Sequence, residues 1–264
     1  MSNKKIAFIC PTHPPHFIFA KSLIFSFIQN GYDIQSDLWF VFTNIHDANS
    51  FGNYKNKLIL PSNFCVFDNN GIINIKKLWA IKDLYKSYQY LITIDSETLF
   101  IRNVDLLCVC NNFFKDKILL GNKILPQGKE LTEKIKNRCK ESFTSEFQEK
   151  IDSELYLWFN QPCIYKTNNI DKFFQITKID EDFSLIDWFQ FDYYVYMYFL
   201  ILYEQFSIVD IEIESNYGVL ETIEKLVEIR SYKYKNLKIL CCTQQNLYLF
   251  DSPSLFLLIQ VDRQ

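Results

Sequence analysis

The sequence predicts an α/β protein with a mostly parallel central sheet and helices packed on its faces. Strand-like and helix-like segments alternate through the first hundred residues, which is the pattern of such folds. The strand expected at residues 91–94 is continuously apolar, as in strands covered on both faces. Hydrophobic residues make up 48% of the 264 residues, so the chain can bury the core of one large domain.

The first half of the chain supplies most of the alternation. Its expected strands are rich in apolar, β-branched and aromatic residues and lie at residues 6–10, 38–43, 58–60, 65–67 and 91–95. A helix over residues 17–29 is expected to end at Asn30-Gly31, an ordinary carboxyl-terminal signal. Apolar residues spaced three and four apart predict a second helix over residues 75–88, which leads into the 91–95 strand.

The second half is less regular. Residues 129–154 are highly charged and carry a weak apolar stripe, which predicts a solvated helical insertion. A helix is expected from about residue 187 to residue 203, and residues 158–166 read as a turn into a strand. Further strand-like segments lie at residues 118–121, 207–213, 237–242 and 247–250. We expect a single domain, with a nucleotide-binding half at residues 1–110 and an acceptor-binding half at residues 111–264.

Composition excludes several classes of protein. A net charge of -3 argues against a nucleic-acid binder that neutralises phosphates. The apolar stretch at residues 193–203 is too short to span a membrane, and no signal peptide is visible at the amino terminus. None of the 8 cysteines forms a CxxC pair, so we expect reduced, largely buried thiols and a cytoplasmic protein.

Two carboxylates, Asp95 and Glu97, follow the 91–94 strand and are separated by Ser96. Ligands of open α/β sheets bind at the carboxyl ends of the strands. Two neighbouring acids repel each other unless a cation lies between them, and Mn²⁺ or Mg²⁺ holding a diphosphate is the simplest such cation. A divalent ion there would neutralise a departing diphosphate. The alternative for this common tripeptide is a turn with solvated acids.

The surroundings of this tripeptide resemble the central block of GT-A glycosyltransferases of bacteria. The resemblance covers roughly residues 5–110. It rests on residues 6–12, Lys76-Lys77-Leu78-Trp79-Ala80, residues 90–100 and Val104-Asp105-Leu106. It implies that Asp95 contacts the nucleotide ribose or the metal and that Glu97 binds the metal. Glu97 stands where a second Asp is usual in the family, which makes the metal geometry the point to test.

Other candidate donor-binding residues come from the first-strand loop and the helix before the motif. Pro11, Thr12 and His13 belong to a loop expected at the same sheet edge as Asp95, where they would contact the nucleotide; His16 follows in that loop. Surface histidines are the alternative. Lys76 or Lys77 would reach the diphosphate as a point charge, unless the two lysines form a solvated helix face.

The acceptor half supplies two further sets of candidates. Asn160 and Gln161 have amides suited to sugar hydroxyls, or belong to an ordinary turn. Asp187 and Asp192 are candidates for the carboxylate base that an inverting transferase needs. Asp187 is alternatively a helix cap, and Asp192 a buried partner for a lysine or a tyrosine.

The expected function is transfer of a sugar from a nucleotide-sugar, preferably UDP-linked, to a glycan hydroxyl. The resemblance implies a surface glycan such as capsule or lipooligosaccharide, and peripheral association with the inner face of the cytoplasmic membrane. A sugar-phosphate nucleotidyltransferase is an alternative, although such enzymes usually carry a Gly-rich loop where this chain has Pro11-Thr12-His13-Pro14. A non-catalytic GT-A-like nucleotide- or glycan-binding domain is the third hypothesis.

Overall fold

The computed structural model describes residues 4–64, 71–100, 103–122, 129–144, 155–157, 163–210 and 258–260. Its strands are β1 Ile6–Pro11, β2 Ser36–Phe42, β3 Lys57–Ile59, β4 Tyr90–Thr93, β5 Thr98–Phe100, β6 Ile118–Asn122, β7 Tyr156–Leu157, β8 Cys163–Lys166, β9 Ser207–Asp210 and β10 Leu258–Gln260. Its α-helices are α1 Phe17–Gln29, α2 Tyr32–Gln35, α3 Ile45–Ser50, α4 Ile72–Leu84, α5 Leu106–Asp116, α6 Lys129–Lys140, α8 Ile170–Thr177 and α9 Asp192–Glu204. Short 3-10 turns are η1 Pro14–His16, η2 Ser62–Phe64, η4 Thr167–Asn169 and η5 Phe183–Leu185.

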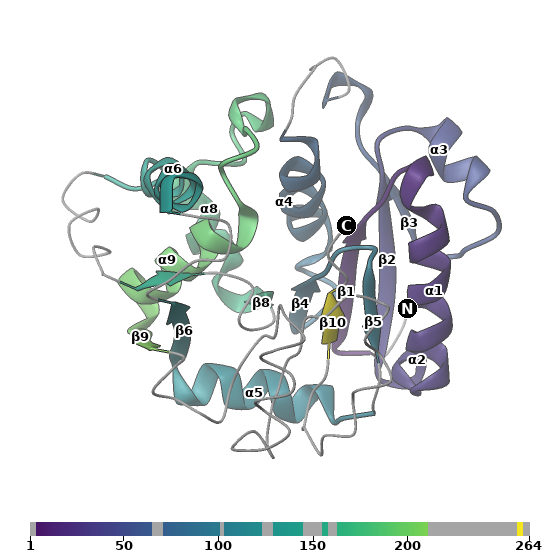
Figure 1. The fold of residues 1–264 in the computed structure, drawn as a ribbon, viewed down its shortest axis with the longest axis horizontal. Coiled ribbons are helices and arrows are strands. Elements are labelled where there is room, and N and C mark those ends of the chain that lie inside the picture. The colour runs from purple at the N-terminus through teal and green to yellow at the C-terminus, as the bar shows by residue number, and fades with distance from the viewer. Residues whose placement is uncertain are drawn as a thin grey trace.

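The central sheet has five strands in the order β3-β2-β1-β4-β8. β3, β2, β1 and β4 run parallel, and β8 pairs antiparallel with β4. Helices α1, α2 and α3 lie on one side of this sheet and α4 on the other, with α6, α8 and α9 beyond α4 (Figure 1). The α/β class and the mostly parallel sheet are therefore confirmed, and the arrangement is compatible with a Rossmann-like fold.

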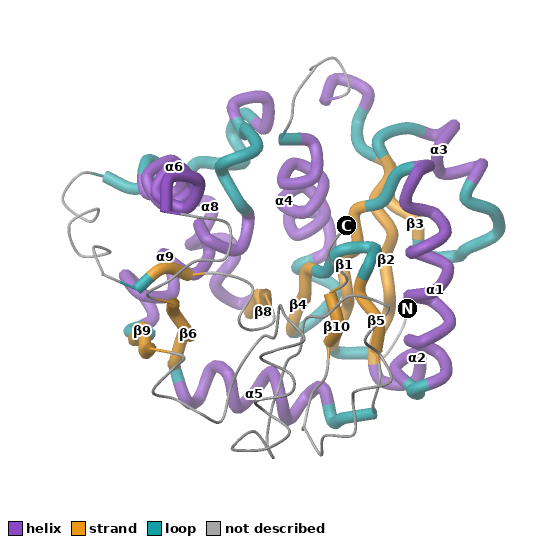
Figure 2. The backbone as a smooth tube through the Cα atoms, viewed as in Figure 1, coloured by secondary structure: helices purple, strands orange, loops and turns teal. Residues whose placement is uncertain are grey.

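Two smaller sheets flank the central one (Figure 2). β6 pairs with β7 and β9, and β5, which follows the Asp95-Ser96-Glu97 segment, pairs antiparallel with β10. The Ser26 hydroxyl accepts a hydrogen bond from the Phe100 backbone N–H at 3.1 Å, and the Asn30 amide donates to the Phe100 carbonyl at 2.8 Å. These bonds fix β5 against α1, and with it one end of the acidic segment.

The core lies in two layers, one on each face of the sheet. Alternate β1 residues point to opposite layers, as strand geometry requires. Phe8 packs with α1 and α2, whereas Ala7 and Ile9 pack with α4 and α9. Every residue of β1 and of β4 is buried, as the continuous apolar run predicted. α1 ends where predicted, because Gly31 adopts the left-handed conformation at φ 72°.

Several element boundaries differ from the prediction. β4 ends at Thr93, so Asp95 lies beyond the strand, and the helix expected from residue 187 begins at Asp192. Residues 129–140 of the predicted insertion are helical. The strands predicted at residues 65–67, 237–242 and 247–250, and residues 145–154 of the predicted insertion, lie outside the described residues. In the part of the chain that the structure describes, no helix is both long and apolar enough to cross a membrane.

Candidate functional site

The candidate site lies where β1 and β4 end at the carboxyl edge of the sheet. The chain leaves β1 toward β2 on one side and reaches β4 on the other, so the strand order reverses between β1 and β4. In open α/β sheets this switch point is where ligands bind. The loop after β1 carries Thr12, and the loop after β4 carries Asp95. The two predicted donor-binding segments therefore meet at one edge, joined by the parallel pairing of β1 with β4.

Lys77 is the central cation of the site. It projects from α4, and its side chain is only 4% exposed. Its ammonium lies 2.9 Å from Asp95 Oδ1 and 3.8 Å from Asp192 Oδ1. Burial alone would lower the pKa of Lys77, but attraction to Asp95 and Asp192 outweighs it and leaves the pKa above its usual value. Lys77 therefore carries a positive charge at the sheet edge.

Asp192 lies behind Lys77 and is fully buried. Its Oδ2 accepts hydrogen bonds from the Thr93 hydroxyl at 3.1 Å and the Tyr165 hydroxyl at 2.5 Å. Its Oδ1 has no hydrogen bond among the described residues and faces Lys77. Burial raises the pKa of Asp192, although the charge of Lys77 opposes the rise. A base must reach the acceptor hydroxyl, so this geometry favours the alternative expectation, a buried partner for lysine and tyrosine.

Glu97 has a partner of its own in His16, at the end of the loop that follows β1. His16 Nδ1 lies 2.9 Å from Glu97 Oε1 and 3.2 Å from the Ser96 hydroxyl. The Ser96 hydroxyl also donates to Glu97 Oε2 at 3.2 Å. His16 is buried, and its ring lies against that of His13 at 4.1 Å between centroids. The structure thus brings the first-strand loop against the acidic segment, and it buries one of the two loop histidines.

Lys76 stabilises the loop after β1 from the same helix. Its ammonium donates to the Thr12 carbonyl at 2.7 Å. Both Lys76 and Lys77 are buried, so the alternative of a solvated lysine face is wrong. Pro11 ends β1 and is buried, as is Thr12. The burial of the two lysines could not be predicted from the sequence, because their partners come from distant segments of the chain.

Asp187 lies in the turn before α9, five residues ahead of Asp192. Its Oδ1 accepts hydrogen bonds from the backbone N–H groups of Phe189 and Gln190, and its Oδ2 accepts one from Arg138 Nε at 2.6 Å. Its side chain is 44% exposed. Asp187 therefore caps a turn, while Phe191 is the residue at the N-cap of α9. Asn160 and Gln161 lie outside the described residues.

The metal hypothesis rests on Asp95 and Glu97. Among the residues that the structure describes, no three His, Cys, Asp or Glu side chains gather closely enough to hold a metal ion. Mg²⁺ commonly takes one or two carboxylates together with substrate phosphates, and two acids at a strand end fit that donor set. Asp95 is 24% exposed at its side chain and suits this role. Glu97 would have to exchange His16 for the metal, because His16 holds its Oε1.

Three residues that support the site were not identified from the sequence, namely Tyr165, Thr93 and Arg138. Tyr165 and Thr93 lie on paired strands, since Thr93 pairs with Cys163, two residues before Tyr165. Both hydroxyls therefore point at Asp192 from neighbouring strands. The only available signal was the presence of hydroxyl side chains in apolar strands. Arg138 gave no signal, because it belongs to a charged helix.

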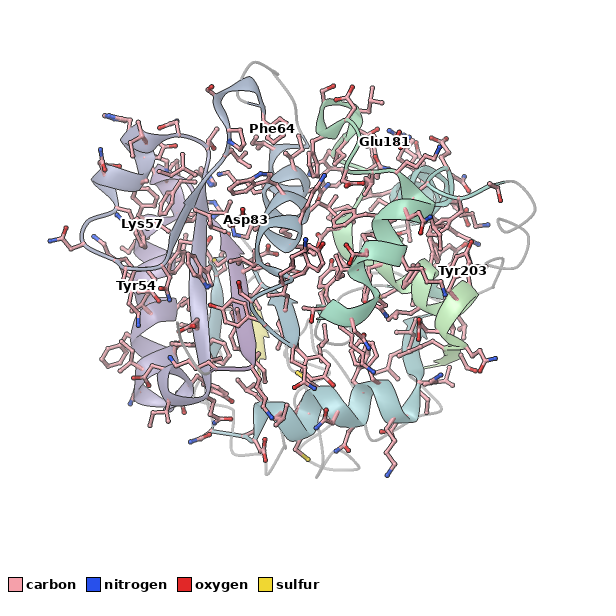
Figure 3. The ribbon with its side chains drawn as sticks, turned by 180° about the vertical axis from the view of Figure 1, so that it is seen from behind. Tyr54, Lys57, Phe64, Asp83, Glu181 and Tyr203 are labelled. Atoms are coloured by element: carbon pink, nitrogen blue, oxygen red, sulfur yellow. The ribbon has the colours of Figure 1, made fainter. Side chains whose placement is uncertain are left out.

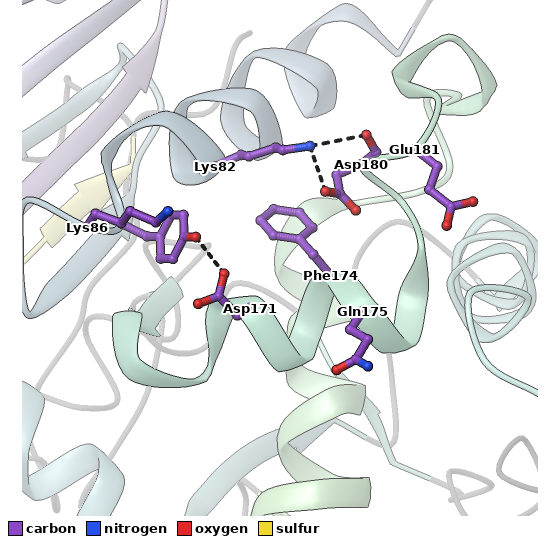
Figure 4. Close-up of a pocket in the computed structure, with 8 residues that line it drawn as sticks. Lys82, Lys86, Asp171, Phe174, Gln175, Asp180 and Glu181 are labelled. Atoms are coloured by element: carbon purple, nitrogen blue, oxygen red, sulfur yellow. Dashed lines mark hydrogen bonds and ion pairs between the residues drawn. The ribbon is translucent and has the colours of Figure 1, made fainter.

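A pocket of about 460 Å³ lies between the carboxyl-terminal part of α4 and α8 (Figure 4). Within it Lys82 pairs with Asp180 at 2.6 Å, and the Tyr85 hydroxyl donates to Asp171 at 2.5 Å. Its charged groups thus face one another. No residue of the Lys77 and Asp95 cluster lines it, so we place the candidate site at the sheet edge instead.

Comparison with known proteins adds no family to these observations. Neither the scan against protein-family models nor the search of curated proteins found a match. The fold and the site therefore define an α/β protein with charged groups at the carboxyl edge of its sheet.

Proposed function

We propose that this chain is a glycosyltransferase that moves a sugar from a nucleotide-sugar donor, preferably UDP-linked, to a glycan hydroxyl. The observation that carries the proposal is the buried Lys77 ammonium, 2.9 Å from Asp95 at the switch point of the sheet. A protein rarely buries a lysine beside a partly exposed aspartate at a sheet edge unless the pair is structural or meets a ligand. The GT-A-like sequence around both residues favours the ligand.

The chemistry of such a transfer suits these groups. The departing nucleoside diphosphate carries negative charge, which the ammonium of Lys77 and a protonated His16 would offset. Mn²⁺ or Mg²⁺ held by Asp95 and Glu97 would supply Lewis-acid stabilisation of the same charge. Asp192, with Thr93 and Tyr165, holds Lys77 in place from behind. Lys76 fixes the Thr12 carbonyl, which orients the loop expected to contact the nucleotide.

Of the two base candidates, we propose Asp187. It is partly exposed, whereas Asp192 is buried completely. Its carboxylate accepts a hydrogen bond from the Arg138 guanidinium at 2.6 Å, and its partial exposure leaves it accessible to an acceptor hydroxyl, as a base requires. Asn160 and Gln161 remain proposed contacts to sugar hydroxyls. A bacterial surface glycan as acceptor, and a site of action at the cytoplasmic face of the membrane, remain part of the proposal.

A second candidate function is nucleotide-sugar or glycan binding without transfer. This function is favoured because both carboxylate oxygens of Glu97 already have protein partners. Oε1 lies 2.9 Å from His16 Nδ1, and Oε2 accepts a hydrogen bond from the Ser96 hydroxyl. Binding without a metal ion would leave these contacts of Glu97 in place, whereas metal binding would require Glu97 to give them up.

A thermal-shift screen of nucleotide-sugars with and without Mn²⁺ tests the proposal. A ligand at 100 times its Kd stabilises the folded state by about 2.7 kcal/mol. We expect at least one UDP-sugar to raise the Tm of the wild type, with a larger rise in Mn²⁺, and Glu97→Ala to lose the Mn²⁺-dependent part. A shift independent of Mn²⁺ in both proteins, without turnover, would support the binding domain. No shift with any nucleotide-sugar would refute the transferase and the nucleotide-sugar-binding domain.

A further inference from the structure

Trp188 is exposed on the loop that joins η5 to α9. Of the three tryptophans in the described residues, Trp39 and Trp79 are partly buried and pack on the core, while Trp188 is 38% exposed. Its neighbours Ile186 and Gln190 are buried. The loop is thus anchored on both sides of an indole ring that meets solvent, which calls for an explanation other than core packing.

The backbone of this loop is fixed from α4. The Asn74 side-chain amide donates to the carbonyls of Asp187 and Trp188, at 3.1 and 3.2 Å. A Cβ added at Gly71 would lie 2.4 Å from the Ile186 carbonyl, so the two backbones are in close contact. Phe64, labelled in Figure 3, packs edge to face on Phe183 at 5.3 Å and adds a contact from η2. The loop therefore has a defined position relative to α4.

The indole ring itself is also held in place. Trp188 meets the rings of Phe189 and Phe191 edge to face, both at 5.3 Å between centroids. Phe191 in turn contacts Tyr193 at 5.7 Å, and Tyr193 is buried in the core. An exposed ring fixed in this way loses little conformational entropy when a ligand stacks on it.

The loop is tied to the candidate site at two points. Asn74, which holds the loop, precedes Lys77 by about one turn of α4, a rise of about 4.5 Å along the helix. Asp192, four residues after Trp188, lies 3.8 Å from the Lys77 ammonium. Trp188 therefore stands at the rim of the site that contains Lys77 and Asp95.

We propose that Trp188, flanked by Asp187 and Arg138, binds a pyranose ring of the acceptor glycan. This inference rests on the proposed function and names the acceptor contact. One face of a pyranose ring presents C–H groups that can lie on an indole ring, while its hydroxyls need donors and acceptors at the edge. The partly exposed Asp187 carboxylate and Arg138 guanidinium supply both. A membrane surface suits this rim less well, because an ion pair, Arg138 with Glu141 at 2.6 Å, adjoins it.

The test uses a glycan array probed with labelled full-length protein, followed by titration of the best-binding glycan. We expect Trp188→Ala to weaken glycan binding at least tenfold and Trp188→Phe to retain most of it. The Tm rise with the UDP-sugar should be unchanged in both variants. Leu185→Ala is the matched control, because Leu185 is another exposed apolar residue of the same loop region, and should bind as the wild type does.

The outcomes separate this inference from the proposed function. Equal glycan affinity of wild type and Trp188→Ala, or no binding to any glycan of the array, would overturn the role of Trp188 while leaving donor binding intact. Glycan binding that depends on Trp188, in a protein that no nucleotide-sugar stabilises, would keep the glycan site and refute the transferase. A loss shared by Leu185→Ala would indicate a general disturbance of the loop and would also overturn the inference.

Discussion

Replacing Lys77 by methionine removes the buried cation between Asp95 and Asp192. At the observed N–O distances of 2.9 and 3.8 Å, each attraction is about 4–6 kcal/mol at an effective dielectric constant of about 20, before desolvation is subtracted. Removing one partner of a buried pair costs about 3–5 kcal/mol, because an uncompensated charge remains. We therefore expect Lys77→Met to lower the free energy of unfolding by about 3–5 kcal/mol, a fall in Tm of roughly 6–20 °C.

Urea unfolding monitored by circular dichroism measures this change. Lys82→Met is the matched control, because Lys82 lies on the same helix and pairs with Asp180 while 44% exposed, so its loss should cost less than about 1 kcal/mol. The double variant Lys77→Met with Asp192→Asn removes the stranded carboxylate and should recover at least about 1 kcal/mol over the sum of the single variants. Additive effects, or a cost for Lys77→Met no larger than that of Lys82→Met, would show that Lys77 does not compensate the charge of Asp192.

The remaining predictions concern the supports of the site. Tyr165→Phe removes one hydrogen bond to buried Asp192 and should lower the urea midpoint by an amount equivalent to about 1–3 kcal/mol; an unchanged midpoint would contradict that bond. Gly71→Ala should cost about 1–3 kcal/mol in the same assay, because its Cβ would collide with the Ile186 carbonyl, and a neutral result would count against the close contact. Burial raises the pKa of Tyr165 and Tyr193 well above the ordinary value, so their contribution to stability is present below about pH 10 and is lost as pH rises further. Absorbance titration should show these tyrosines ionising only with unfolding; a full titration of the native protein near pH 10 would contradict it.

The sequence predicted the elements whose signals are local. The end of the α1 helix at Gly31 follows from a residue that tolerates positive φ. β1 and β4 follow from continuous apolar runs that two covering layers require. The start of α9 was placed five residues early, because Asp187 caps a separate turn that has the same residue preferences as a helix cap.

The candidate site was harder to predict because its contacts join distant segments. Asp95 was correctly placed at the carboxyl edge of the sheet, but its partner Lys77 fitted a solvated helix face equally well. α4 lies between the sheet and α9, so this helix buries polar as well as apolar residues. A single sequence does not show which helix is covered on both sides. The contact of His16 with Glu97 likewise depends on how two loops meet at a sheet edge.

The most direct test of the central claim measures release of nucleoside diphosphate from a panel of nucleotide-sugars in Mn²⁺. We expect slow release from at least one UDP-sugar by the wild type, and a loss of at least tenfold in Asp95→Asn at a temperature where circular dichroism shows both proteins to be folded. Lys82→Met, away from the site, should release it at the wild-type rate. Equal release by Asp95→Asn and wild type, or no release from any donor together with no stabilisation by any donor, would contradict it.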